Sequence, residues 1–382
     1  MNIPGVAMQP SARLAGVAHA RRLDAFLLTH LPTIRHLSGY FFNFETGPSP
    51  FHLLPACLVA VTGGEACLIA ADTEAGQLSA VYPGIMTRLY ASYVCERPLD
   101  FARQFQVQLQ ETINALGLPK ARLGIEPASL PVLVRQELEG SFPGLEMIDV
   151  TAEVARLRLI KAPEEIESIR KAVHLCDVGQ ETLLNAARPG VTELELFTSV
   201  RAAMEVAAGG RFPLMADFVS GPRTELAGGG PSARMIQAEE LILSDLTPCL
   251  DGYWGDTCHT AVAGSPSPIQ SAMFRRVQEA LDLGIQAIRP GVRASAIDRL
   301  MREHLAALGT YPHHSGHGLG VTYHEEPRIV PYNDLELAPN MVVALEPGVY
   351  RDGQGVRLEH VTVVTEDGCE VLSRFQHRLS SL

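Results

Sequence analysis

The stretch from His313 to Glu359 constrains the chain most, because it places acidic side chains inside strand-like apolar sequence. It reads HHSGHGLGVTYHEEP and, after a connection, MVVALEPGVYRDGQGVRLEH. Glu346 and Glu359 each interrupt an apolar run, and a carboxylate is costly to bury unless it is paired or bound to a cation. A hard metal ion would satisfy both side chains.

The histidines of this stretch lie among glycines at positions 316, 318 and 320. Repeated glycine argues against a helix, because glycine is the most costly ordinary residue to fix in a helix interior. In an extended chain, alternate side chains share a face, so His313, Ser315 and His317 are expected to point the same way.

A second acidic pair lies upstream, in LILSDLTPCLDGYWGDTCHTAV. Asp245 interrupts one apolar run and Asp256 begins another, with Asp251-Gly252 between them as a hairpin-turn signal. The aspartates are 11 residues apart (256 − 245) and the glutamates 13 (359 − 346). An odd separation puts both side chains on one face of a hairpin with an even loop. Four carboxylates and a histidine are enough ligands for two hard divalent cations.

The sequence also repeats internally. RPGV occurs at residue 188 and again at residue 289, and the same offset of 101 separates Asp245 from Glu346. One offset that aligns a helix end and a ligand candidate predicts two related halves. Each half would contain a helix, a second helix and a carboxylate hairpin, with a binuclear metal site at their pseudo-twofold interface.

A family resemblance follows from the ligand candidates taken in order. They match the five metal ligands of the pita-bread metallopeptidases in type, order and approximate spacing: Asp245, Asp256, His317, Glu346 and Glu359. The motifs GHGLG, HEEP, LEPGVY and GVRLE resemble the prolidase and aminopeptidase P branch. This resemblance implies an α/β creatinase-type N-terminal domain over residues 1–155. It also implies an α+β pita-bread catalytic domain over residues 156–382 with an internal pseudo-twofold repeat.

The resemblance also implies a role for each ligand. Asp256 and Glu359 would bridge two ions, Asp245 would complete the ligation of one, and His317 and Glu346 that of the other. A hydroxide held between the ions would be the nucleophile. Glu346 is the predicted catalytic proton shuttle, which delivers the proton of that water to the leaving nitrogen. Ligation dominated by carboxylates favours Mn²⁺, with Co²⁺ or Zn²⁺ as alternatives.

His313 and His324 match the two substrate-side histidines of the family and are predicted as catalytic and substrate-binding residues. They would donate hydrogen bonds to substrate oxygen, although each could instead hold a ligand carboxylate in place. His314 is expected to be structural. Arg357 is a candidate substrate-binding residue that could pair with a substrate carboxylate or instead anchor a ligand.

Three positions depart from the family pattern. Gly228 stands where prolidases usually carry a substrate-binding histidine, and Cys258 and His259 stand where they usually carry threonine and arginine. Another group could fill the place left at Gly228; the candidates are Arg223, Arg234 and His259. On this reasoning, Gly228→Ala should cost little activity unless the glycine needs a positive φ.

The composition indicates which classes of partner and which cellular compartment to expect. The chain has 31 Lys and Arg against 43 Asp and Glu, a net charge of −12, and no basic run, so we expect neither nucleic acid nor membrane as a partner. The N-terminus lacks the apolar core of a signal peptide. Seven cysteines form no CxxC pair or compact framework, which is typical of a reducing, cytoplasmic location. The resemblance also implies a homodimer.

The predicted function is metal-dependent hydrolysis of the Xaa-Pro bond in dipeptides or short peptides. The departure at Gly228 leaves a second reading open, in which the same metals hydrolyse a non-peptide C–N bond, as in a small-molecule amide or amidine hydrolase of the ectoine-hydrolase type. A catalytically silent binding protein is a third reading. The complete ligand set argues against it, because a binding scaffold need not retain five ligands.

Overall fold

The computed structural model describes residues 10–42 and 54–380. The first nine residues, which carry part of the argument about a signal peptide, lie outside this range. The chain divides into two compact units, Met1–Arg158 and Leu159–Leu382. In the described part of the chain, no helix has both the length and the apolar character needed to span a bilayer.

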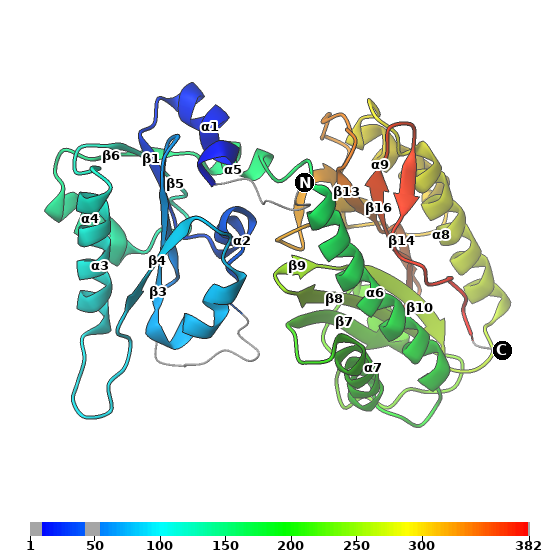
Figure 1. Cartoon of the computed structure of the whole chain (residues 1–382). Coiled ribbons are helices and arrows are strands. Elements are labelled where there is room, and N and C mark those ends of the chain that lie inside the picture. The colour runs from blue at the N-terminus through cyan, green and yellow to red at the C-terminus, as the bar shows by residue number, and fades with distance from the viewer. Residues whose placement is uncertain (1–9, 43–53, 381–382) are drawn as a thin grey trace, which may run out of the picture. The chain divides into compact units, whose positions relative to one another are not determined.

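The first unit is a mixed six-stranded sheet with helices on both faces (Figure 1). The strands follow the order β4-β3-β2-β1-β5-β6; they are β1 (Ala25–Leu28), β2 (Cys57–Val61), β3 (Ala66–Ala71), β4 (Ile85–Tyr90), β5 (Arg122–Ile125) and β6 (Glu146–Asp149). The helices are α1 (Pro10–Arg21), α2 (Leu31–Ser38), a 3₁₀ helix (Asp72–Ala80), α3 (Phe101–Ala115), α4 (Val132–Ser141) and α5 (Thr151–Arg156).

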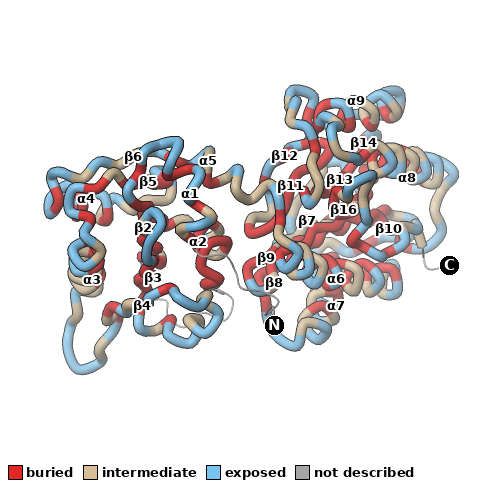
Figure 2. Tube along the Cα trace, turned by 45° about the horizontal axis from the view of Figure 1, so that its top comes forward, coloured by how far each residue is buried: buried red, intermediate tan, exposed pale blue. Residues whose placement is uncertain are grey.

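Alternation along the strands explains the two layers of helices. In β1, Leu27 belongs to the apolar cluster that contains Leu109 of α3, whereas Leu28 belongs to the cluster that contains Ile34 of α2. Successive strand side chains point to opposite faces, so each face of the sheet buries its own set. The central strands of this sheet are accordingly coloured as buried in Figure 2.

The second unit packs two pairs of helices against antiparallel strands (Figure 1). Its helices are α6 (Pro163–Ala186), α7 (Glu193–Ala208), a 3₁₀ helix (Gly221–Leu226), α8 (Pro268–Ala287) and α9 (Ala294–Leu305). One sheet has the order β10-β8-β7 with β9 paired to β8, from β7 (Leu214–Ser220), β8 (Leu241–Leu250), β9 (Tyr253–Trp254) and β10 (Thr257–Val262). A second has the order β12-β11-β13-β16-β17, from β11 (Gly316–Gly318), β12 (Glu325–Ile329), β13 (Val342–Leu345), β16 (His360–Val364) and β17 (Cys369–Val371); β14 (Gly348–Arg351) pairs with β15 (Gln354–Arg357).

The predicted two-half organisation is confirmed. Gly190 between α6 and α7 has φ +86°, and Gly291 between α8 and α9 has φ +82°. This is the left-handed conformation that glycine adopts without steric cost after a helix end. The first helix pair packs on β8 and β10, and the second packs on β13. The repeated RPGV sequence therefore marks the same turn in both halves.

The two predicted carboxylate hairpins differ from one another. In the first, Asp251 and Gly252 both have positive φ and connect paired strands, as their sequence indicates. In the second, the hairpin β14–β15 lies between the two glutamates. Pro347 follows Glu346 directly and has no N–H to extend the ladder of β13. Glu346 and Glu359 therefore lie just beyond the β13–β16 pairing instead of inside one simple hairpin.

Candidate metal centre

The five predicted ligand side chains converge in the second unit. They come from separate strands or strand ends: Asp245 from β8, Asp256 before β10, His317 from β11, Glu346 after β13 and Glu359 before β16. Nε2 of His317 lies 3.7 Å from Oδ2 of Asp256 and 3.5 Å from Oε1 of Glu346. Its distance to Oε1 of Glu359 is 3.9 Å. Both halves of the repeat thus contribute to one point.

These side chains line a cavity of about 180 Å³. Its lining also contains Met215, Ala216, Asp217, Thr247, Tyr323 and His324. Five of the lining residues are carboxylates and none of the described lining residues is lysine or arginine. Carboxylates this close repel one another, so all of them can be ionised together only when cations enter the cavity.

Glu359 gives the clearest sign that a cation belongs here. Its side chain is 1% exposed, and within the described ranges neither of its carboxylate oxygens has a hydrogen-bond partner. Burial, with the charge of Asp256 nearby, raises the pKa of Glu359 well above its usual range. Burial and the charge of Asp245 do the same to the pKa of Asp256. A divalent ion would replace the missing partners and remove the repulsion, so the residues fit the metal that their chemistry implies.

Hydrogen bonds aim the ligand atoms at the centre. Thr247 Oγ1 donates to Oδ1 of Asp256 at 3.0 Å, and the carbonyl of Gly318 lies 3.0 Å from Nδ1 of His317. Donation from Nδ1–H to that carbonyl leaves the Nε2 lone pair facing the carboxylates. Burial lowers the pKa of His317 to about 3. The ring is therefore neutral near pH 7 and can ligate a metal.

Glu346 is surrounded by histidines. Nε2 of His314 lies 2.7 Å from its Oε1, and Nδ1 of His313 lies 3.8 Å from its Oε2. Burial alone would raise the pKa of Glu346, but the His314 hydrogen bond and the neighbouring histidines lower it below its usual range. His314, expected to be structural, is thus the histidine nearest to the predicted proton shuttle.

The expected alternation across His313, Ser315 and His317 is not observed. Ser315 Oγ donates to Oδ1 of Asp298 in α9, at 2.6 Å, whereas His317 faces the carboxylates. The pairing of β11 with β12 shifts register between Gly316 and Gly318. A bulge of this kind breaks the two-residue period on which the expectation rests.

Of the two predicted substrate-side histidines, one lines the cavity and the other does not. His324 lines the cavity, with its ring centroid 4.3 Å from that of His317. His313 lies behind the cavity lining, with Nε2 2.9 Å from Tyr350 Oη and Nδ1 2.8 Å from the carbonyl of His314. Burial lowers the pKa of each ring to about 4. Both are neutral near pH 7, and His324 has the more open access to a substrate.

The comparisons with known proteins agree with this geometry. Residues 167–366 match metallopeptidase family M24, and residues 11–160 match the creatinase/prolidase N-terminal domain. This chain belongs to metallopeptidase family M24. The Xaa-Pro dipeptidase of Lactobacillus helveticus is 35% identical over 250 residues, covering 64% of this chain and 68% of the relative. An uncharacterized peptidase of Bacillus subtilis, YqhT, is 27% identical over 91% of this chain and 92% of its own length.

Solved structures give the same family fold for this M24 metallopeptidase. The prolidase from Pyrococcus horikoshii superposes with a TM-score of 0.81 at 25% identity, covering 97% of this chain and 99% of that one. The Xaa-Pro dipeptidase from Bacillus anthracis gives 0.82 at 25% identity, with 98% and 99% covered. The predicted fold class, a creatinase-type domain followed by a pita-bread catalytic domain, is confirmed.

The hydrogen bonds of Arg357 in this M24 enzyme go to protein acceptors. Its Nη2 donates to Oδ2 of Asp245 at 2.6 Å and to Oδ2 of Asp217 at 3.3 Å. Its Nη1 donates to the carbonyl of Ala227 at 2.5 Å, and its Nε donates to Cys258 Sγ at 3.3 Å. The guanidinium is buried and stands behind Asp245 instead of lining the cavity.

The candidates proposed to replace the histidine missing at Gly228 already have protein partners. Arg223 pairs with Glu193 and donates to the carbonyl of Gly230 at 2.9 Å, and Arg234 pairs with Glu240. His259 is fully buried against the C-terminal segment, with Nδ1 3.0 Å from Nδ1 of His377 and Nε2 3.0 Å from the carbonyl of Arg378. The side chain nearest to a Cβ at Gly228 belongs to a different residue.

That residue is Asp217, which sequence reasoning missed. A Cβ atom added to Gly228 would lie 2.5 Å from Oδ2 of Asp217. An added methyl group would meet this carboxylate, so the Asp217 side chain would have to shift. The expectation that Gly228→Ala costs little activity stays a prediction. The available signal was an acidic residue inside the strand LMADFVS, similar to the one that revealed Asp245.

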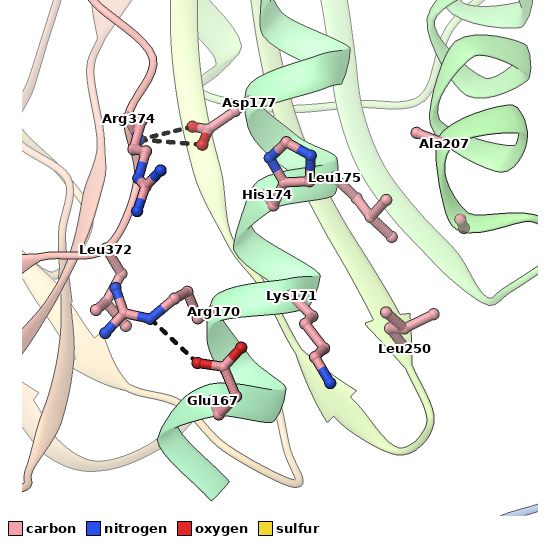
Figure 3. Close-up of a pocket in the computed structure, with 11 residues that line it drawn as sticks. Glu167, Arg170, Lys171, His174, Leu175, Asp177, Ala207, Leu250, Leu372 and Arg374 are labelled. Atoms are coloured by element: carbon pink, nitrogen blue, oxygen red, sulfur yellow. Dashed lines mark hydrogen bonds and ion pairs between the residues drawn. The ribbon is translucent and has the colours of Figure 1, made fainter. Parts of the chain in front are cut away.

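A second, larger cavity, of about 360 Å³, lies along α6 and the C-terminal segment (Figure 3). Two of its charged side chains have partners. Asp177 accepts from the backbone N–H of Arg374 at 3.0 Å, and Arg170 pairs with Glu370 at 2.8 Å. None of the predicted site residues lines it, so the chemistry belongs to the smaller cavity.

Proposed function

We propose that this M24 metallopeptidase hydrolyses the Xaa-Pro bond of dipeptides or short peptides in a metal-dependent reaction. The observation that carries the proposal is the buried cluster of four carboxylates around His317, in which both oxygens of Glu359 have no hydrogen-bond partner among the described residues. The similarity to an Xaa-Pro dipeptidase and to prolidases supports the choice of substrate.

The residues proposed to hold two divalent ions are Asp245, Asp256, His317, Glu346 and Glu359. When bound, such ions lower the pKa of water to about 7 and polarise the scissile carbonyl. Mn²⁺ is our proposed ion, because oxygen ligands dominate the set. Arg357 is assigned the anchoring role of its two possible roles, since it holds Oδ2 of Asp245 at 2.6 Å.

Glu346 is the proposed proton shuttle. An Xaa-Pro bond is a tertiary amide, so its nitrogen must gain a proton as it leaves. The hydrogen bond from His314, 2.7 Å long, holds one oxygen of Glu346 in place. The carboxylate can then accept a proton from water and release it to the proline nitrogen.

His324 is proposed to bind the substrate carbonyl. It lines the cavity beside His317, and a neutral ring can donate one hydrogen bond to an oxygen that gains negative charge. His313, which Tyr350 and the His314 carbonyl hold in place, would support the same substrate side of the cavity.

The proposal extends to domain roles, assembly and compartment. We propose residues 1–155 and 156–382 as the two domains and a homodimer as the assembly, as the family resemblance implies. All seven cysteines are free thiols, which supports a cytoplasmic, reducing compartment.

A panel of three peptides tests the proposal: Leu-Pro, Leu-Pro-Gly and Leu-Ala-Gly, each with Mn²⁺-loaded enzyme of measured metal content. Cleavage of the proline peptides but not of Leu-Ala-Gly is expected. Cleavage of Leu-Pro alone would identify a dipeptidase, and cleavage of Leu-Pro-Gly an aminopeptidase. No turnover of either proline peptide at full metal occupancy would contradict the proposal and favour hydrolysis of a non-peptide C–N bond.

A further inference from the structure

Asp217 is a fifth carboxylate in the cavity, in addition to the four carboxylates proposed as metal ligands. It lies on β7 directly opposite Asp245 of β8 in the antiparallel register. Its side chain is 40% exposed, compared with 15% for Asp245 and 1% for Glu359. Of these carboxylates, Asp217 is therefore the one that an arriving substrate can reach most directly.

Two contacts fix the direction of this carboxylate. Oδ1 of Asp217 accepts the backbone N–H of Gly229 at 2.8 Å, and Oδ2 accepts from Arg357 at 3.3 Å. The nearby Gly228 has no side chain, and a Cβ there would lie within 2.9 Å of three atoms of the Asp217 carboxylate group. The glycine is thus required for Asp217 to occupy this position.

Arg357 only partly offsets the charge of Asp217. Its 2.6 Å bond to Asp245 is much shorter than its 3.3 Å bond to Asp217, and attraction between charges weakens with separation. Arg357 also lies outside the cavity lining. The face that Asp217 presents to the cavity is therefore acidic, with no lysine or arginine among the described lining residues.

We propose that Asp217 is a specificity-determining residue that binds a primary ammonium group on the substrate residue whose carbonyl is cleaved. This inference rests on the proposed function for the identity of that bond. The ammonium group could be the α-amino group or the side chain of a lysine at this position. An ammonium group donates three hydrogen bonds, and the exposed lone pairs of Asp217 can accept one of them.

Two matched substrate pairs separate these sources. Lys-Pro and norleucine-Pro differ by the side-chain ammonium, whereas Leu-Pro and 4-methylpentanoyl-Pro differ by the α-ammonium. We expect the wild-type enzyme to favour the charged member of at least one pair about fivefold or more in kcat/KM, the range of a partly exposed charge-assisted contact. Asp217→Asn should lower kcat/KM for the charged member until it is close to that for the uncharged member.

Variants control for indirect effects. Asp367→Asn removes an equally charged side chain from an exposed turn and should leave both ratios at the wild-type value. Gly228→Ala should lower the same ratio as Asp217→Asn, because it displaces the Asp217 carboxylate while leaving residue 217 unchanged. Asp217→Glu, which retains the charge, should restore part of the preference. Metal content and Tm are measured for every variant.

Binding gives a readout that does not depend on turnover. Calorimetry of the Mn²⁺-loaded full chain with free L-lysine and free L-norleucine, and with L-leucine and 4-methylpentanoic acid, uses probes that have no bond to cleave. Tighter binding of the charged member in wild type but not in Asp217→Asn supports the inference even if Xaa-Pro peptides are not cleaved. Equal ratios in wild type and Asp217→Asn, in both turnover and binding, would overturn it, whether or not the proposed function holds.

Discussion

The two halves of the catalytic unit share one scaffold but support their ligands with different chemistry. Asp245 and Glu346 stand at the same offset of 101 residues as the two RPGV turns. Asp245 is held by a cation, Arg357, at 2.6 Å. Glu346 is held by His314 at 2.7 Å, with a second histidine, His313, 3.8 Å away.

The difference suggests a division of labour within a repeated fold. Burial raises the pKa of Asp245, and the permanent positive charge of Arg357 opposes that shift and fixes the carboxylate, which suits a proposed ligand that only binds. The partners of Glu346 are imidazole rings, which carry no permanent charge and offer both a donor and an acceptor nitrogen, and this suits the proposed proton transfer by Glu346. Arg357 lies on β15, in the other half of the repeat from Asp245. The hydrogen-bond partners of the two carboxylates are therefore not related by the internal repeat.

Of the variants that test this comparison, Glu346→Gln should lose the most activity. We expect kcat for Leu-Pro to fall by at least ~10²-fold, the lower range of general acid–base contributions. Because Glu346 is also a proposed ligand, metal content is measured on the same sample. Wild-type kcat at full metal occupancy would remove Glu346 from the proton-transfer role.

Arg357→Met should lower metal affinity by removing the partner of Asp245. Without the guanidinium, Asp245 loses its anchor and faces Asp217 across the β7–β8 pair. Loss of a residue that orients a ligand typically costs about 10- to 100-fold in metal affinity or activity. Mn²⁺ titration of the full chain measures it, and Arg357→Lys serves as the control that retains charge. Unchanged affinity in Arg357→Met would mean that Asp245 needs no anchor.

His324→Ala should have a smaller effect, because it removes one hydrogen-bond donor and none of the five proposed metal ligands. A lost donor in a buried site costs about 1–3 kcal/mol, so kcat/KM for Leu-Pro is expected to fall roughly tenfold or more. The matched measurement is His313→Ala, whose ring is already engaged by Tyr350. A larger loss in His313→Ala than in His324→Ala would reverse the roles assigned to the two rings.

The convergence of the proposed ligands could be predicted from sequence, because most of the acidic residues have a local signal. A carboxylate inside an apolar strand is anomalous wherever it occurs, and Asp245, Glu346 and Glu359 are all of this kind. The repeat was equally accessible, because glycine after a helix end has a conformational cause. These signals need no knowledge of which strands pair.

The surroundings of the ligands could not be predicted in the same way. Asp217 reaches the site only because β7 pairs with β8 in a register that puts it opposite Asp245, and strand register is set by the whole packed sheet. The assignment of His313 and His314 failed to anticipate the His314–Glu346 contact because the chain around Gly316 departs from regular alternation. The partners of His259 lie more than a hundred residues away, at His377 and Arg378.

Metal stripping and reconstitution test the central claim most directly. The full chain is dialysed against EDTA, titrated with Mn²⁺, and followed by metal analysis and Leu-Pro hydrolysis on the same samples. The account predicts no turnover in the stripped protein and recovery as about two ions bind per chain, the number expected for a binuclear hydrolase. Full turnover by the stripped, chelated protein would contradict it.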